Sequence, residues 1–238
     1  MSEAATLPTA RPTNRDERWR YADPTFLAEG PLSYMYDWGE ERVVAPGATL
    51  RDHALFGGEA RPHGSTTLLR VHVGKGGRFE YFAIVAAQPY MRVELEVTLE
   101  EGAHFEFGGI TIGGGNATRE IVTRVIHAEP GATSNQVVRS VHWGQATGNF
   151  LGRIEVARDA QKTDAAQNFK AILLEKGASA NTKPELEIFA DDVKCAHGAA
   201  IGMLDRNAAF YMEARGLPPE AVRKLLVRLL MALKVFRK

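Results

Sequence analysis

Cysteine is the scarcest residue of this chain, which has one, Cys195, in 238 residues. A single thiol excludes a disulfide within the chain and is typical of a reducing compartment. The N-terminal stretch MSEAATLPTARPTNRDERWRY also lacks the apolar run that a secretory signal peptide requires. We therefore expect a cytoplasmic protein.

An excess of either charge sign is missing too, since 29 Lys and Arg residues face 29 Asp and Glu residues. A neutral chain gives no electrostatic reason to expect nucleic acid or an anionic membrane surface as a partner. The longest apolar run, LLVRLLMAL, is nine residues long and includes Arg228. This is far below the roughly 20 residues that span a bilayer, so no membrane partner is expected.

Several motifs of catalysis and nucleotide binding are absent. VGKGG (73–77) lacks the spacing of a Walker phosphate-binding loop, and GGGNAT (113–118) has Thr118 where G-x-G-x-x-G requires a glycine. No H-E-x-x-H or paired C-x-x-C occurs, and GASAN (177–181) does not match G-x-S-x-G. We therefore expect no nucleotide on this chain, interpret the glycine-rich segments as turns, and take His127 and His142 as ordinary core or surface histidines.

What the chain has instead, from about residue 43 onward, is short runs in which apolar and polar residues alternate. RVELEVTLE (92–100) and EIVTRVIHAE (120–129) are examples, and a period of two residues is typical of half-buried strands. The turns between the runs resemble one another, as in APGATL, GKGGRF, EEGAHF and EPGATS. The body is therefore expected to be mainly β.

These turns recur at a nearly constant spacing. The turn glycines at 47, 76, 102 and 131, followed by Ala160 in RDAQKT, are separated by 29, 26, 29 and 29 residues, and shorter steps lead to Gly177 and Gly198. A strand–turn unit repeated at this period predicts a β-solenoid, in which each coil buries its inner face against its neighbours. A β-sandwich is the alternative.

The segments on either side of this body have a different pattern. We divide the chain into an N-terminal arm with a short helix (1–42), a β-helix core (43–204) and a C-terminal helical segment (205–238). In the arm, residues 15–21 can form a short helix that stops before Pro24, and we expect Trp19 and Tyr21 to dock on the body.

The C-terminal segment predicts two helices. Asp205 can cap the first, Gly216 fits the position after its end, and Pro219 suits the first turn of the second. Apolar residues at spacings of three and four form one stripe on the second helix. The stripe comprises Val222, Leu225, Leu226, Leu229, Leu230 and Leu233. It either caps the solenoid or faces a partner.

Cys195 and His197 form the one candidate site for chemistry. In a strand, residues i and i+2 point to the same face, about 7 Å apart, so both side chains could reach one ion. Thiolate and imidazole suit iron, zinc or an iron–sulfur species, but two ligands leave a tetrahedral site incomplete. The alternatives are a buried thiol beside a turn histidine, or a nucleophilic cysteine, for which no His and Asn or Asp arrangement stands out.

Two stretches resemble a known family. The tract TKPELEIFADDVKCAHGAAIGMLDRNAAFYMEARG (182–216), within the matching region 163–227, closely resembles the C-terminal core of the SufB/SufD family of iron–sulfur cluster assembly proteins. RDERWRYAD (15–23) resembles an N-terminal signature of its SufD branch. The SufB branch usually has extra cysteines in its middle region, so a chain with one cysteine is more similar to SufD.

The resemblance implies a right-handed parallel β-helix with flanking helical segments. It implies a non-catalytic scaffold subunit that pairs with a SufB-like subunit through the end of the β-helix and docks a SufC-like ATPase. The leucine stripe would be the ATPase dock. His197, with Cys195, would meet iron or a nascent cluster at the interface with SufB, and a homodimer is an option for the isolated chain.

Family members are commonly longer at both ends, so docking of the ATPase here could be weaker or differently arranged. A second class of function, a carbohydrate-active β-helix enzyme, would need a cleft rich in carboxylates and usually secretion. The absence of a signal peptide argues against that alternative.

Overall fold

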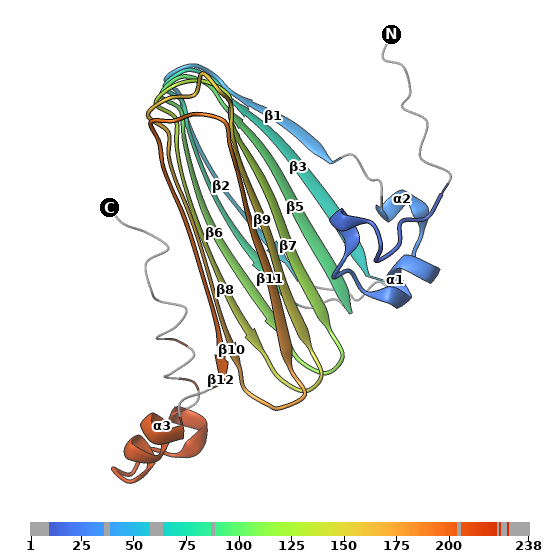
Figure 1. The fold of residues 1–238 in the computed structure, drawn as a ribbon. Helices are drawn as coiled ribbons and strands as arrows, with labels where there is room; N and C mark the ends of the chain where they lie inside the picture. Colours follow the sequence, from blue (N-terminus) through green and yellow to red (C-terminus); the bar gives the residue numbers. More distant parts are fainter. Residues whose placement is uncertain are drawn as a thin grey trace.

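The computed structural model describes residues 10–35, 39–57, 64–86, 89–203, 206–222, 224 and 228. Its body is a parallel β-solenoid, in which the chain passes alternately through two facing six-stranded sheets (Figure 1). Every strand pairs in parallel with the strands one coil before and after it, so the solenoid prediction is confirmed and a sandwich is excluded. None of the helices in this described part is long and apolar enough to cross a membrane.

Each coil contributes one strand to each sheet. Sheet A contains β1 (Glu40–Val44), β3 (Ser65–Val73), β5 (Tyr90–Leu99), β7 (Thr118–His127), β9 (Thr147–Val156) and β11 (Ser179–Ile188). Sheet B contains β2 (Thr49–Phe56), β4 (Arg78–Val85), β6 (His104–Gly113), β8 (Thr133–His142), β10 (Asp164–Leu173) and β12 (Lys194–Met203). We call β1 with β2 the first coil and β11 with β12 the last coil.

The recurring turns stack at one end of the coils. Gly47, Gly76, Gly102 and Gly131 each have a positive φ, which glycine adopts without steric cost. Each donates its N–H to a carbonyl of the next turn, as Gly47 does to Lys75 at 2.9 Å. The number of residues between successive turn glycines is therefore the number of residues in one coil.

One position of the predicted turn series was wrong, because Gly198 lies inside a strand, whereas Ala160 and Gly177 lie in turns. Lys162, with φ of 62°, takes the left-handed position instead of Ala160, and its N–H donates to the Asp192 carbonyl at 2.7 Å. Gly177 lies in the β10–β11 connection at the opposite end of the coil, and Gly198 lies inside β12. The turn before β10 is longer than its predecessors, so its left-handed residue lies two positions after Ala160.

The space between the sheets is packed with side chains that alternate along each strand. In the earlier coils it holds stacked aromatic rings: Phe79 and Phe105 have centroids 5.6 Å apart, and Tyr81 and Phe107 6.2 Å apart. Both Phe105 and Phe107 are fully buried. Burial of this apolar surface is the main source of stability for such a coil.

The N-terminal arm lies against sheet A (Figure 1). It contains η1 (Glu17–Trp19), α1 (Pro24–Glu29) and α2 (Leu32–Met35). Asp23 caps α1 by accepting the N–H of Phe26 at 2.9 Å, and Pro24 occupies the first turn, where a missing N–H costs little. A small separate core forms under the arm. It consists of Trp19, Ala22, Phe26, Leu27, Met35 and Tyr90.

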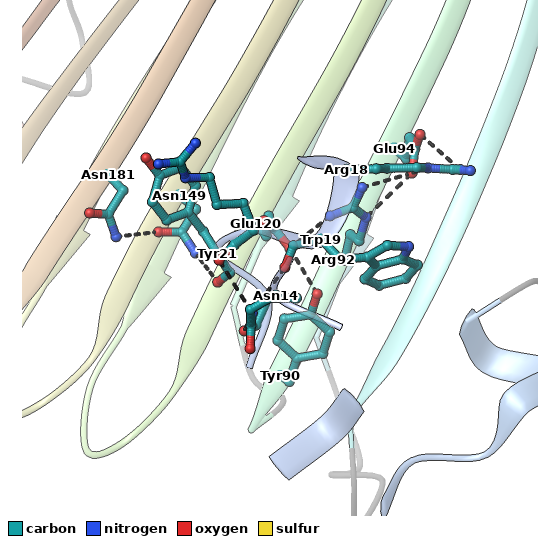
Figure 2. Close-up of polar contacts among 12 residues, drawn as sticks. Asn14, Arg18, Trp19, Tyr21, Tyr90, Arg92, Glu94, Glu120, Asn149 and Asn181 are labelled. Carbon is teal, nitrogen blue, oxygen red and sulfur yellow. Dashed lines mark hydrogen bonds and ion pairs between the residues drawn. The ribbon is translucent and has the colours of Figure 1, made fainter. Parts of the chain in front are cut away.

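Beneath the arm is a buried ion pair (Figure 2). Arg92 and Glu120 meet at 3.0 Å with both side chains almost fully buried, and the Tyr90 hydroxyl donates to Glu120 at 2.8 Å. Trp19 covers the guanidinium, with its ring centroid 4.4 Å away. Asn149 donates to the backbone carbonyl of Tyr21 at 2.9 Å, so Trp19 docks on the body through its ring and Tyr21 through its backbone.

After β12 the chain forms α3 (Arg206–Glu213). Gly216 follows it with φ of 90°, as expected for a glycine past a helix end. Helical residues resume at 219, and Val222 donates its N–H to the Pro218 carbonyl at 3.1 Å.

Candidate functional site

The last coil is the open end of the solenoid. β11 and β12 are the terminal strands of their sheets, so within the described residues each has one edge with no strand beside it. Apolar side chains are exposed there: Ile188 by 38%, Ile201 by 44% and Met203 by 51%. Their register partners one coil earlier, such as Val156 for Ile188, are covered by the next coil. An exposed edge with apolar neighbours is a surface that can accept another chain.

Cys195 and His197 lie on the inner face of this coil. They are in register with Ala165 and Gln167, whose side chains are buried between the sheets. The structure therefore brings the two side chains to the same face, as their i, i+2 spacing predicts. His197 is exposed, whereas Cys195 is half-buried and packs against a small apolar cluster that includes Ala165 and Ala190.

The Cys195 thiol is not activated by its surroundings. Burial raises its pKa, the charge of Asp164 raises it further, and a hydrogen bond from the Ala165 backbone opposes both. The thiol is therefore protonated at neutral pH, which argues against an independent nucleophile. A metal ion or an added cation would be needed to produce the thiolate.

Three of the acidic residues of the same tract form ion pairs elsewhere. Glu187 pairs with Arg153 at 2.5 Å, Glu185 with Lys183 at 2.8 Å, and Asp192 forms an ion pair with Lys162. Among the described residues, no group of three or more His, Cys, Asp or Glu side chains is placed to hold a metal ion. Cys195 and His197 thus offer two donors, and any complete coordination shell needs ligands from another molecule.

The first coil, at the other end of the solenoid, carries charged side chains at its inward positions, and these form ion pairs. Arg42 of β1 forms an ion pair with Asp52 of β2 and another with Glu40 at 2.7 Å. All three side chains occupy inward positions, in register with Val71, Tyr81 and Leu69 respectively. The Arg42 guanidinium holds the pKa of the Asp52 carboxyl below its usual range, against the effect of partial burial. Inward charges of this kind discourage pairing at an exposed edge. The sequence analysis did not identify them.

His127 and His142 are core residues. Both are fully buried, and burial lowers the pKa of each to about 4. His127 contacts the Ser134 hydroxyl at 2.9 Å, and His142 contacts that of Thr111 at 3.2 Å. They are neutral structural histidines at neutral pH.

Only one residue of the predicted leucine stripe can be placed. Val222 is buried, with 1% of its surface exposed. Leu225, Leu226, Leu229, Leu230 and Leu233 lie outside the described residues. Their role as a docking surface stays a prediction.

Comparison with known proteins identifies the family. Residues 41–229 match the SufBD core domain of the SUF system of FeS cluster assembly. This segment covers the solenoid except Glu40, the first residue of β1, and continues into the C-terminal helical region.

Individual relatives agree. A SufBD family protein of Synechocystis is 34% identical over 155 residues, which are 65% of this chain and 34% of the relative. The chloroplastic protein ABCI7 of Arabidopsis thaliana is 40% identical over 46% of this chain and 23% of its own length. SufD of Escherichia coli is 36% identical over 42% of this chain and 24% of its own length.

The matched segments thus span about a quarter to a third of these relatives. The match to the core domain nevertheless covers most of the chain. This protein therefore belongs to the SufBD family of iron–sulfur cluster assembly proteins.

Proposed function

We propose that this chain is a non-catalytic scaffold subunit, most similar to SufD, in a complex that assembles iron–sulfur clusters. One observation supports this most strongly: the core-domain match coincides with a solenoid whose last coil is open and presents Cys195 and His197. The absence of a phosphate-binding loop from the sequence fits a division of labour in which a partner hydrolyses ATP.

The partner on the last coil would be a SufB-like subunit. Two free parallel edges allow a partner strand to continue each sheet, and Ile188, Ile201 and Met203 supply apolar contact area beside them. A homodimer could form through the same edges. A second copy of this chain and the SufB-like subunit would therefore compete for one surface.

Iron or a nascent cluster is the cargo of this interface. His197 would supply an imidazole and Cys195 a thiolate once the metal displaces its proton. The remaining ligands would come from the SufB-like subunit, because the part of this chain that the structure describes offers too few donors by itself. The C-terminal stripe beyond Val222 would dock a SufC-like ATPase, which is a separate contact on a separate element.

Co-purification tests the scaffold role. The untagged chain is co-expressed with its SufB-like and SufC-like partners, and the complex is isolated through the ATPase. We expect a ternary complex that contains all three proteins. Recovery of SufB with the ATPase but without this chain would refute the proposal.

The role of His197 is tested within that complex. His197→Ala removes an exposed side chain, so we expect unchanged thermal stability and unchanged partner binding but a lower yield of iron and sulfide per complex. His53→Ala, on the exposed face of the first coil, is the matched control. A normal cluster yield in the His197 variant would contradict the assigned role.

A further inference from the structure

A row of polar side chains runs through the later coils and ends at the open coil. Gln136 of β8 is in register with Gln167 of β10, and Gln167 with His197 of β12. The row begins with Asp52 in the first coil and continues with Tyr81 and Phe107 in the second and third coils. The interior therefore changes from aromatic to polar along the one row that leads to His197.

These amides are buried with unused hydrogen-bonding capacity. Gln136 is 0% exposed and Gln167 2%. Among the described residues, neither amide atom of Gln136 has a hydrogen-bond partner, and neither does Oε1 of Gln167. Nε2 of Gln167 donates to the Gly152 carbonyl at 3.2 Å. Buried polar atoms without partners are costly, and native proteins commonly satisfy them with ordered water.

The opposite wall supplies a further polar atom. Gln167 faces Gly152 of sheet A, and one coil earlier the register places Thr123 opposite Gln136. The Thr123 hydroxyl is buried and also has no partner among the described residues. Two neighbouring positions carry smaller side chains than one coil earlier, because Ser134 follows Phe105 in register and Thr123 follows Leu95.

We propose that this layer binds ordered water. A water molecule would bridge the Gln136 amide to Oε1 of Gln167 and the Thr123 hydroxyl, and hydration would continue along the row to His197. The layer has uncharged donors and acceptors in the number that a buried water requires. Water on the inner side of His197 would then persist after a partner covers the outer side. The proposal rests on the register and the unpartnered atoms and is independent of the scaffold role.

A crystal structure of the full chain is the direct test. At a resolution that shows ordered solvent, we expect density within hydrogen-bond distance of Gln136 and Thr123. Direct bonding of the Gln136 amide to Gln167, with no density between them, would overturn the proposal.

Magnetic relaxation dispersion of water oxygen-17 gives a second test in solution. Gln136→Met combined with Thr123→Val replaces the polar atoms with apolar groups of similar size. Because a folded protein holds on the order of one buried water per 27 residues, the readout is the difference from wild type. We expect the variant to lose long-lived water, whereas the exposed control Gln145→Met loses none. An identical dispersion for wild type and a folded double variant would refute the site.

Discussion

The first and last coils of this solenoid differ in the inward side chains that they carry at corresponding positions. Arg42 and Asp52 occupy the inward positions of the first coil that Leu186 and His197 occupy in the last coil. An ion pair therefore crosses the first coil, whereas the last coil presents an aliphatic side chain and an imidazole. Since an open strand edge favours association, the difference is the reason for proposing the last coil as the partner surface.

The coils between the ends must remain intact for this comparison to hold, and the arm stabilises them. Arg92→Met would leave Glu120 buried without its counter-charge, so we expect a loss of about 3–5 kcal/mol in the free energy of unfolding. Chemical denaturation measures it. Arg18→Met, which removes the partly exposed contact to Glu94, is the control and should cost less than about 1 kcal/mol. A similar, small loss for both variants would show that the buried pair does not stabilise the arm.

Moving the charges of the first coil to the last coil should convert an open end into a closed one. Leu186→Arg with His197→Asp places the pair at the corresponding inward positions. We expect about 100-fold weaker binding to a SufB-like partner, because the docked partner would desolvate both charges. Isothermal titration measures the affinity. Leu55→Asp, at a 69% exposed position of the first coil, is the control and should bind normally. Unchanged binding by the folded last-coil variant would place the interface elsewhere.

The buried histidines of the interior should make the free energy of unfolding depend on pH. The unfolded chain protonates His127 near pH 6.5, whereas burial lowers the pKa in the folded protein to about 4. Stability is therefore lost as the pH falls from about 6.5 towards 4, by about 2 kcal/mol at pH 5 for this group.

Urea unfolding at about pH 7.5 and pH 5 measures this loss, and His142 should add a comparable one. His127→Gln should reduce the pH dependence, whereas Gln145→Met, at an exposed position without a titratable group, should leave it unchanged. An equal pH dependence in all three proteins would contradict the assignment.

Removing the charges of the first coil should have the smallest effect on stability. The Arg42 and Asp52 side chains are partly exposed, so replacing both with Leu should change the free energy of unfolding by less than about 1 kcal/mol. We expect instead that the variant self-associates more strongly than wild type, as measured by sedimentation velocity over a concentration series. Identical sedimentation would show that the ion pair does not protect this edge.

Local patterns predicted the coils because each coil repeats the same local requirements. Glycines at 47, 76, 102 and 131 satisfy a positive φ, and alternation fixes which residues face inward. The same alternation correctly placed Cys195 and His197 on one face. The prediction failed at Gly198, which lies inside β12 although CAHGAA resembles the turn segments.

Contacts between distant segments left no comparable signal. Asn149 binds the carbonyl of Tyr21, 128 residues earlier, and no local pattern reports such a contact. The row from Gln136 through Gln167 to His197 could have been found, because its steps of 31 and 30 residues match the coil length. The charges of the first coil could be interpreted only once the coils had been counted and the ends were known.

Hydrogen–deuterium exchange of this chain with and without its SufB-like partner tests the central claim most directly. It reports on the backbone amides of both ends in one experiment. We predict new protection in β11 and β12, at residues 179–188 and 194–203, and none in β1 and β2. Protection confined to residues 40–56, with the last coil unchanged, would contradict the account.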